Sequence, residues 1–335
     1  MKRIVWPLLP LVPLYGVAQA LDNWSYARGW RRVERLKWPV VSVGNLSVGG
    51  AGKTPFVIAL ARALMKRMWA VDVLSRGYRR ISDAVERVAA DVEDAAARYG
   101  DEPSLIAGRP EVPVFVARER VAAGRLAETT LVDVAGMRRV HLLDDGMQHR
   151  RLHREVEIVL LHRSDFRTTL LPAGRLREPL AALGRADFVV LREEDVDLEE
   201  RARRWMRADA RLWTIRRELE VPALPGAAVV FCAIAHAEEF LEGLRVRGVA
   251  IAAAHAWRDH HRFTDGDVTM VCASAAKHRG ACFLTTEKDL VRLTERQRAE
   301  LERTGPLFTA GLTVRLRDAE AALDALETRL MERHA

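Results

Sequence analysis

The sequence predicts an α/β fold in which helices cover both faces of a parallel sheet. From residue 38 onward, short runs rich in Val, Ile and Leu alternate with longer segments of helical composition. Strands that are apolar throughout, rather than at every second position, are typical of parallel sheets buried on both faces. A glycine-rich loop also joins the first of these runs to a helical segment, as expected where a strand is followed by a helix.

The elements of this fold can be assigned in order along the chain. We expect buried strands at 40–43, 71–74, 112–116, 140–143 and 156–161, with a helix over 54–65 after the first. A strongly charged stretch at 211–220, followed by Val-Pro-Ala-Leu-Pro-Gly at 221–226, predicts a linker. A second α/β block then has strands at 227–233, 249–253 and 281–285, a helix at 266–278, a run at 307–314 and a helix at 318–333.

Length and composition agree with two folded domains. The chain has 335 residues, 49% of them hydrophobic, which excludes a disordered chain and allows about two domains of ~150 residues. We therefore divide it into an N-terminal segment at 1–32, a first domain at 33–220 and a smaller second domain at 221–335. Whether the C-terminal helix packs on the first domain is left open.

Charge and cysteine content limit the kinds of partner. Fifty-three Lys and Arg against 46 Asp and Glu give a net charge of +7, which favours an anionic partner. Aromatic residues make up only 6% and are not interleaved with a basic patch, so no nucleic acid is expected. The three cysteines form no Cys-x-x-Cys pair, which argues against a zinc cluster or a disulfide framework.

The first 32 residues have an unusual composition. Residues 4–21 carry no charge, follow Lys2 and Arg3, and lead into a flank of Trp, Tyr and Arg at 24–32. A membrane-spanning helix would need about 18–20 residues, and three prolines remove backbone donors that lipid cannot replace. A secretory signal would explain Ala-Gln-Ala at 18–20, but the nucleotide motif described next argues against export. We favour an N-terminal membrane-surface helix.

The glycine-rich loop after residues 40–43 is the strongest local motif. A buried strand, a glycine loop and a helix beginning with Lys-Thr are the parts of a P-loop, where backbone N–H groups bind phosphate. Lys53 offers a cation to the β- and γ-phosphates of ATP, and the Thr54 hydroxyl reaches Mg²⁺. Ser47 occupies a position that the strict motif gives to glycine. The predicted nucleotide-binding residues are Gly49, Gly50, Ala51, Gly52, Lys53, Thr54 and Pro55.

Two carboxylates follow a neighbouring apolar run. Asp144 and Asp145 come directly after residues 140–143, where a buried strand would end. Mg²⁺ usually takes one or two carboxylates together with phosphate oxygens. We therefore predict Thr54, Asp144 and Asp145 as metal ligands, without deciding which aspartate contacts the ion. An exposed Asp-Asp-Gly turn is the alternative.

Three further polar clusters are less specific. Gly-Asp-Glu-Pro at 100–103 by itself favours a helix cap, with Asp101 as the N-cap residue. The loop at 172–179 carries Arg175 and Arg177, which can clamp phosphate or pair with surface carboxylates. Two adjacent histidines at 260 and 261 make a poor metal site without a third ligand. The role of Glu287, Lys288 and Asp289 after the run at 281–285 stays open.

Taken together, these stretches are similar to the tetraacyldisaccharide 4'-kinases of lipid A biosynthesis over nearly the whole chain. Each motif is short, but their order along the chain is specific. One departure is Arg79, where that family usually continues Ser-Arg-Gly-Tyr with glycine. The resemblance is carried by the N-terminal segment, the loop at 44–55, Ser75–Tyr78, Gly100–Pro103, Asp144–His149, Gly174–Glu178, Asp259–His260 and Thr286–Asp289.

The resemblance implies a P-loop NTPase-like fold of two α/β domains with the active site between them. It implies ATP- and Mg²⁺-dependent phosphorylation of the 4'-hydroxyl of a tetraacylated disaccharide 1-phosphate at the cytoplasmic face of the bacterial inner membrane. Besides Lys53, it implies that Asp101 accepts the hydroxyl proton, supported by His260. An anionic membrane surface is the expected partner, and no obligate protein partner is expected. The implied substrate contacts are Arg76, Arg120, Arg177 and Glu178.

Two other classes of protein remain as alternatives. A P-loop GTPase or ATPase switch, or a metallochaperone-type regulator, also carries Gly-Gly-x-Gly-Lys-Thr. A guanine-specific member should show Asn-Lys-x-Asp, and the Glu-Lys-Asp at 287–289 has the wrong spacing. A non-catalytic membrane-associated module would bind ATP without lipid turnover.

Overall fold

The computed structural model describes residues 4–50, 52–89, 92, 94–109, 112–132 and 136–334. Ala51, one of the predicted nucleotide-binding residues, lies outside them. The strands are Val40–Asn45 (β1), Trp69–Ser75 (β2), Glu86–Arg87 (β3), Val114–Val116 (β4), Arg138–Asp144 (β5), Val156–Leu160 (β6), Phe188–Arg192 (β7), Arg211–Glu220 (β8), Ala228–Cys232 (β9), Ile251–Ala256 (β10), Cys282–Thr286 (β11) and Leu307–Leu316 (β12). The α-helices are Val12–Ala27 (α1), Lys53–Lys66 (α2), Ala95–Tyr99 (α3), Asp101–Ala107 (α4), Arg120–Thr130 (α5), Glu199–Arg203 (α6), Ala237–Val246 (α7), Asp265–His278 (α8), Glu287–Leu290 (α9), Glu295–Thr304 (α10) and Ala319–His334 (α11).

One mostly parallel sheet runs through the molecule. Among the described residues it has twelve strands in the order β10-β9-β11-β12-β8-β7-β6-β1-β5-β2-β4-β3. Only the pairs β8–β12 and β3–β4 are antiparallel among the described strands. Val43 of β1 pairs with Asp144 of β5, so the loop after β1 and the acidic residues after β5 leave the same edge of the sheet. The predicted α/β fold with a large parallel sheet is confirmed.

Helices cover both faces of β1 and its neighbours. Val41 belongs to a cluster with Phe56 of α2 and Leu326 of α11, whereas Val40 packs on the opposite face with Val121 of α5. Successive side chains of a strand point to opposite faces of the sheet. All six residues of β1 are buried, which explains its unbroken apolar pattern.

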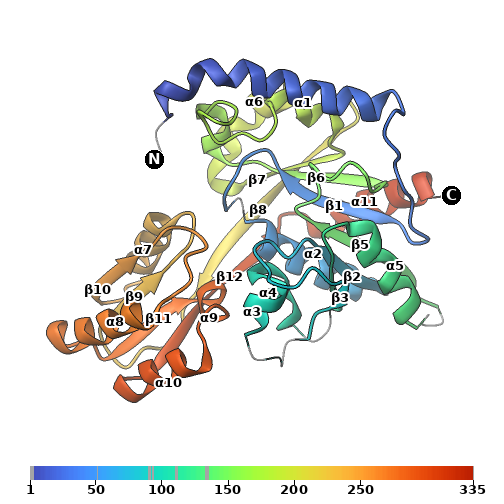
Figure 1. Ribbon diagram of the computed structural model, residues 1–335. Coiled ribbons are helices and arrows are strands. Elements are labelled where there is room, and N and C mark those ends of the chain that lie inside the picture. The colour runs from blue at the N-terminus through green and yellow to red at the C-terminus, as the bar shows by residue number, and fades with distance from the viewer. Residues whose placement is uncertain are drawn as a thin grey trace.

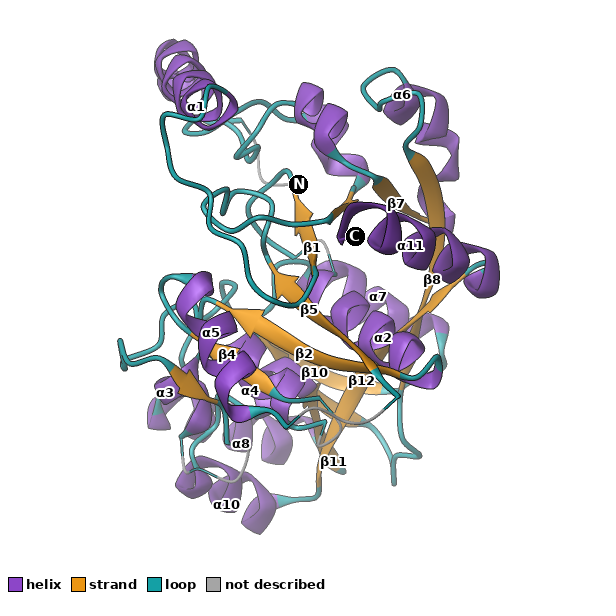
Figure 2. Ribbon diagram, turned by 90° about the vertical axis from the view of Figure 1, so that its right-hand side faces the viewer, coloured by secondary structure: helices purple, strands orange, loops and turns teal. Residues whose placement is uncertain are grey.

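The sheet divides into a larger and a smaller lobe, which β8 and β12 connect (Figure 1). In the smaller lobe, Phe231 and Phe283 pack with Val268 of α8, while Val230 packs with Leu244 of α7 on the other face. The C-terminal helix α11 returns to the core of the larger lobe (Figure 2). The last part of the chain therefore completes the first core.

The prediction of a linker at 211–220 is wrong, because these residues form β8. This strand pairs with β7 on one side and with β12 on the other. Trp213 and Ile215 point into the core of the larger lobe, while Arg216, Glu218 and Glu220 lie on the opposite face of the strand. Much of the high charge therefore belongs to one face of a connecting strand. Of the predicted linker, residues 221–226 alone are neither strand nor helix. The strand β7 was not among the predicted strands.

The N-terminal segment lies along the outside of the larger lobe (Figure 1). A short 3-10 helix, Trp6–Leu11, leads into α1, and none of the residues of these two helices is buried. The exposed side chains Leu14, Val17 and Leu21 share one face of α1. Within the described ranges, no helix has both the length and the apolar character that crossing a bilayer requires.

Candidate active site

The loop after β1 leads into the N-terminus of α2. Gly49 and Gly52 have φ angles of 108° and 82°, values that favour glycine because a Cβ would be strained there. Gly52 is the residue before α2 and has no side chain to cap the helix. The first N–H groups of α2 are therefore directed at the cleft that Gly52, Lys53 and Thr54 line. Such a helix N-terminus can bind an anion.

Lys53 is held by two residues at the edge of the sheet. Its Nζ donates a 2.9 Å hydrogen bond to Asn45 Oδ1 and lies 3.3 Å from Asp145 Oδ1. Arg177 binds both oxygens of Asp145 at 2.9 and 2.7 Å. Although burial favours the protonated form, Lys53 and Arg177 hold the pKa of Asp145 well below its usual range. Asp145 is thus a charged carboxylate that already has two cationic partners.

Asp144 has a different environment from its neighbour. It is buried at the end of β5, and its Oδ1 has no hydrogen-bond partner among the described residues. Burial, followed by the charges of Glu102 and Asp145, raises the pKa of Asp144 to about 7. Because a buried carboxylate oxygen without a partner is costly, a hard cation fits this position. Thr54 lines the same cleft. The exposed-turn interpretation of Asp144 and Asp145 is therefore not supported.

Asp101 does not cap its helix, so that alternative is wrong. The residue before α4 is Gly100, and the Asp101 carboxylate instead reaches the smaller lobe. Its Oδ2 lies 2.8 Å from His260 Nδ1 and accepts hydrogen bonds from the buried Arg292. Burial raises the pKa of Asp101, but the hydrogen bond from His260 and the charge of Arg292 lower it further, so the net shift of this pKa is downward. Asp101 is therefore an ionised and weakly basic carboxylate.

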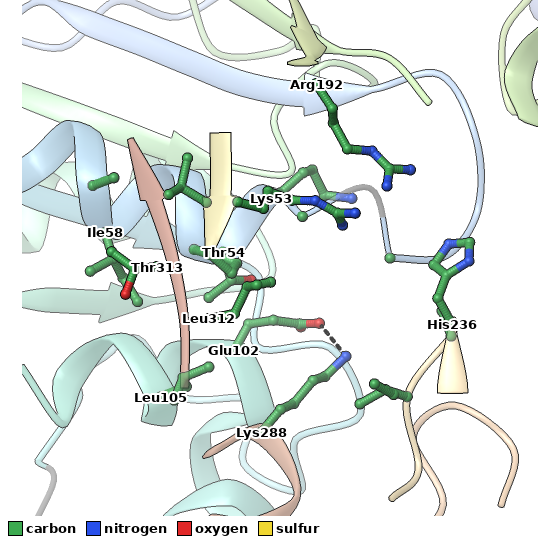
Figure 3. A pocket seen from close by; sticks show the side chains of 18 of the residues that line it. Lys53, Thr54, Ile58, Glu102, Leu105, Arg192, His236, Lys288, Leu312 and Thr313 are labelled. Atoms are coloured by element: carbon green, nitrogen blue, oxygen red, sulfur yellow. Dashed lines mark ion pairs between the residues drawn. The ribbon is translucent and has the colours of Figure 1, made fainter. Parts of the chain in front are cut away.

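The other ring nitrogen of His260 remains on the cleft side of this pair. His260 Nε2 lies 3.4 Å from Lys288 Nζ and 3.8 Å from Glu102 Oε1. Lys288 Nζ also lies 3.3 Å from Glu102 Oε1 of α4, and Figure 3 shows Glu102 between Thr54 and Lys288. The segment after β11, whose role the sequence left open, thus contributes to the site.

Arg292 and Asn45 are polar partners that the sequence reasoning missed. Arg292 Nη1 donates 2.7 and 2.8 Å hydrogen bonds to Asp289 Oδ1 and to the Ala233 carbonyl oxygen. The only local signal was the spacing of three residues between Asp289 and Arg292, which places them on one helical turn. Asn45 ends β1 beside the predicted motif, so its proximity to Lys53 was available from the sequence.

The four predicted substrate contacts have different positions. Arg76, Arg120 and Arg177 line the cleft, and burial lowers the pKa of Arg120 to about 10. Glu178 is buried, does not line the cleft, and accepts hydrogen bonds from Arg185 at 2.6 Å and from Gln148, a lining residue, at 3.1 Å. Glu178 therefore acts on the loop around it rather than on a ligand.

Most of these groups line one cleft between the lobes. Asn45, Asp101, Arg292 and Glu178 do not line it but contact residues that do. The volume of the cleft is about 2390 Å³, whereas a pocket for one small ligand typically has ~300–1,000 Å³. Lys53 and Thr54 come from the larger lobe, and Lys288 comes from the smaller lobe (Figure 3). His260 also belongs to the smaller lobe, where it follows β10. The cleft is large enough to hold two reactants, one against each lobe.

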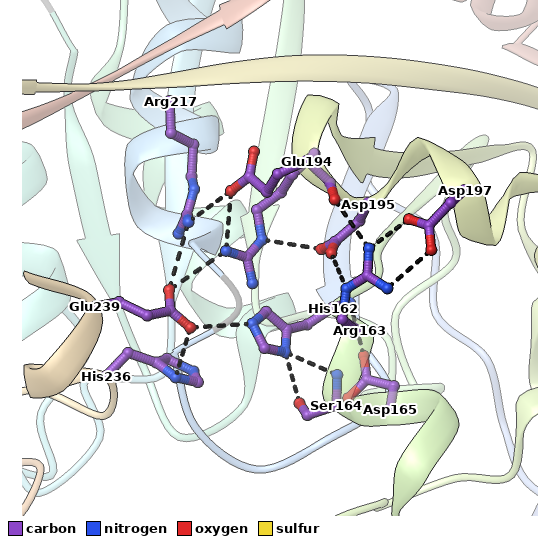
Figure 4. Close-up of polar contacts among 11 residues, drawn as sticks. His162, Arg163, Ser164, Asp165, Glu194, Asp195, Asp197, Arg217, His236 and Glu239 are labelled. Carbon is purple, nitrogen blue, oxygen red and sulfur yellow. Dashed lines mark hydrogen bonds and ion pairs between the residues drawn. The ribbon is translucent and has the colours of Figure 1, made fainter. Parts of the chain in front are cut away.

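A second polar cluster bridges the lobes on another side of the cleft (Figure 4). Glu239 of α7 lies 3.4 Å from His162 Nε2 and 3.3 Å from His236 Nδ1, close enough for a metal site. However, His162 Nδ1 accepts the Ser164 N–H, which leaves the proton of a neutral ring on Nε2. Arg192 also lies 3.4 Å from the same carboxylate. We therefore interpret the cluster as an ion-pair contact between the lobes.

The fold and the cleft define an α/β protein whose ligand site lies at one edge of a parallel sheet, where a glycine-rich loop enters a helix. The chain belongs to the family described as tetraacyldisaccharide-1-P 4'-kinase, whose model matches residues 4–331. The resemblance found in the sequence is thereby confirmed.

Individual relatives agree with this assignment. A tetraacyldisaccharide 4'-kinase of Koribacter versatilis is 40% identical over 327 residues, which cover 95% of this chain and 97% of the relative. One from Geobacter metallireducens is 36% identical, covering 98% and 99%. A crystal structure described as the "apo" form of LpxK from Aquifex aeolicus in complex with ATP has a TM-score of 0.75 and 31% identity. That match covers 97% of this chain and 98% of the other.

Proposed function

We propose that this protein is a tetraacyldisaccharide 4'-kinase of lipid A biosynthesis. It transfers the γ-phosphate of ATP to the 4'-hydroxyl of a tetraacylated disaccharide 1-phosphate. The observation that carries this proposal is the shared cleft, which both Lys53 of the larger lobe and His260, the partner of Asp101, line. The family, its many kinases of the same name and the ATP complex from Aquifex aeolicus support it.

We propose that the triphosphate of ATP binds to the loop at 49–55, including Ala51. The glycines let the backbone approach the phosphate oxygens, and the N-terminus of α2 favours negative charge. Lys53 then contacts the β- and γ-phosphates, held in place by Asn45 and Asp145. In phosphoryl transfer, positioning and charge neutralisation supply most of the rate.

Mg²⁺ is the metal that the residues fit. We propose that Asp144, through its unpartnered buried oxygen, and the Thr54 hydroxyl would hold it. When bound, the ion would neutralise charge on the phosphates. Asp145 was also predicted as a ligand, but we assign it instead to orienting Lys53, because Lys53 and Arg177 already contact its carboxylate.

The acceptor hydroxyl must lose a proton as its oxygen bonds to phosphorus and ADP leaves. The sequence interpretation gave that proton to Asp101. Because Arg292 and His260 both stabilise the Asp101 carboxylate, we assign proton acceptance to His260 Nε2 and orientation of the ring to Asp101. The ring nitrogen can take the proton while Nδ1–H stays bonded to the carboxylate.

The disaccharide 1-phosphate needs cationic contacts on the cleft wall. We propose Arg76 and Arg120 for these contacts, since both guanidinium groups line the cleft. Arg120 is 7% exposed and lies near Arg76, Asp144 and Asp145. A buried guanidinium remains charged at neutral pH and can bind phosphate in a bidentate manner.

The acyl chains of the substrate require an enzyme at a membrane surface. We propose that α1 lies in the interface at the cytoplasmic face of the inner membrane, with Leu14, Val17 and Leu21 in the lipid. The basic flank would meet anionic head groups. We also propose the division into 1–32, 33–220 and 221–335, with α11 joined to the core of the first domain.

The kinase proposal is tested by incubating the purified protein in detergent with Mg²⁺, ATP and tetraacyldisaccharide 1-phosphate. We expect the lipid to gain the mass of one phosphate, and a Lys53→Ala variant to form far less of this product in the same time. Bound ATP without any lipid product would contradict the proposal and favour another acceptor or a nucleotide-dependent switch.

The membrane proposal is tested by removing residues 1–24 and sedimenting the protein with anionic vesicles. We expect the truncated chain to stay largely in the supernatant, because the apolar face of α1 is lost. Equal sedimentation of both proteins would overturn the assignment of α1 to the membrane surface.

A further inference from the structure

The helix α1 is hydrogen-bonded to a loop that reaches the nucleotide site. The Tyr15 hydroxyl donates a 3.0 Å hydrogen bond to the backbone oxygen of Arg177. Ahead of α1, the Val5 N–H donates a 2.8 Å hydrogen bond to the Ala173 carbonyl oxygen. The N-terminal segment thus contacts the loop at 168–178 in two places.

That loop is in turn paired with the beginning of the nucleotide loop. The Arg177 N–H donates to the Leu46 carbonyl oxygen at 2.7 Å, and the Val48 N–H donates to the Arg175 carbonyl oxygen at 2.8 Å. The guanidinium of Arg175 also binds the Val48 carbonyl oxygen at 2.6 Å. A displacement of the Arg177 backbone would therefore also displace residues 46–48.

The side chain of Arg177 continues the connection to the nucleotide lysine. Its guanidinium binds both oxygens of Asp145 and lies 2.6 Å from Asn45 Oδ1. Asn45 and Asp145 are the two residues that contact Lys53 Nζ. A continuous set of polar contacts thus links Tyr15 to Lys53 through Arg177.

We propose that Tyr15 is a positioning residue for the nucleotide site. Its hydroxyl holds the Arg177 main chain, so that the Arg177 guanidinium keeps Asn45 and Asp145 against Lys53. The helix that we assign to the membrane surface therefore also supports the ATP site. The inference rests on the proposed ATP site at Lys53 and is independent of the lipid acceptor.

The two faces of α1 separate this role from membrane contact. Tyr15 lies on the half-buried face that meets the larger lobe, whereas Leu14, Val17 and Leu21 are exposed on the opposite face. Burial, followed by the charge of Glu178, raises the pKa of Tyr15, so its hydroxyl stays protonated and can donate at neutral pH. A residue that served only as lipid anchor would not need a hydroxyl directed at the protein.

The test is the affinity of the full-length protein for MgATP, measured by isothermal titration in detergent without lipid acceptor. We expect Tyr15→Phe to weaken binding about two- to tenfold, the effect of one net hydrogen bond. Tyr26→Phe is the matched control on the same helix. The described side-chain contacts of Tyr26 are made by its ring, with the guanidinium groups of Arg150 at 5.3 Å and Arg31 at 5.5 Å. We expect the Tyr26→Phe variant to bind MgATP with the affinity of the wild type.

A double-mutant cycle shows whether the effect passes through Arg177. In an Arg177→Ala background, Tyr15→Phe should cause a clearly smaller loss than in the wild type, because the guanidinium that transmits most of the effect is gone and only the main-chain contact with Leu46 remains. An unchanged affinity of Tyr15→Phe, or the same additional loss in both backgrounds, would overturn the proposal. Failure of the wild type to bind MgATP is a different result, because it would refute the proposed ATP site itself.

Discussion

The two halves of the proposed site, one for the nucleotide and one for proton transfer, are assembled in different ways. The nucleotide half is local: Lys53 binds Asn45 eight residues away, across one strand-loop-helix unit. The proton-transfer half joins Asp101 to His260 and Arg292, which are 159 and 191 positions away. The first half is therefore built within the larger lobe, whereas the second forms only when both lobes are folded and in contact.

This difference predicts that the two halves fail differently when altered. We propose that a residue of the nucleotide half contacts ATP in the ground state and more strongly in the transition state, so its loss should raise KM and also lower kcat. A residue that moves only the proton should affect kcat alone. The variants below test that separation, from the largest expected effect to the smallest.

Replacing His260 should give the largest and most selective loss. We expect His260→Ala to lower kcat by about 10²–10⁴-fold, the usual contribution of a positioned general base, with little change in the KM for ATP. Steady-state kinetics with the lipid acceptor measure both values. His261→Ala is the control, because His261 pairs with Asp267 inside the smaller lobe at 2.9 Å. A large rise in the KM for ATP of His260→Ala would contradict the assignment of separate kinetic roles to the two halves.

Lys53→Ala should damage both kinetic parameters. We expect a loss in kcat of about 10²–10³-fold, because the phosphates lose a positioned cation, and a higher KM for ATP. Lys277→Ala removes an exposed lysine of α8 and should leave both values unchanged. Near wild-type turnover by Lys53→Ala would refute the assignment of the loop.

The Mg²⁺ requirement should depend on pH through Asp144. Its pKa is raised to about 7, so the carboxylate is protonated below that pH and competes with the cation. We expect the apparent Mg²⁺ requirement to increase up to about tenfold per pH unit below 7 and to level off above 8. Magnesium titrations of activity at pH 6 and pH 8 measure this. An Asp144→Asn variant with the same pH dependence would place the proton elsewhere.

The smallest effect is expected at an ion pair beside the second half. Arg109 and Glu287 join the lobes at 2.7 Å, but both side chains are about one-third exposed. Such a pair contributes less than about 1 kcal/mol, so Glu287→Gln should change kcat/KM by less than about fivefold. A loss as large as that of His260→Ala would show that Glu287 belongs to the proton-transfer half.

Most of the nucleotide half could be predicted because its signals are local. The glycines around Lys53 adopt backbone angles that other residues avoid, and their spacing is visible in the sequence. Asp144 and Asp145 were found in the same way, since parallel strands end at one edge of a sheet. The separate roles of Asp144 and Asp145 were not predicted, because they depend on tertiary contacts. Arg177 contacts Asp145, whereas one oxygen of Asp144 has no partner among the described residues.

The sequence by itself determined the α/β fold, the glycine loop and the family, because these depend on apolar periodicity and on ordered short motifs. Only the tertiary structure decided that 211–220 form a strand, that the Asp101 carboxylate binds Arg292 instead of capping its helix, and that the Tyr15 hydroxyl binds Arg177. Each of these outcomes depends on a partner more than 90 residues away along the chain. Local patterns carry no information about such a partner, since burial and pairing are set by the packing of the whole chain.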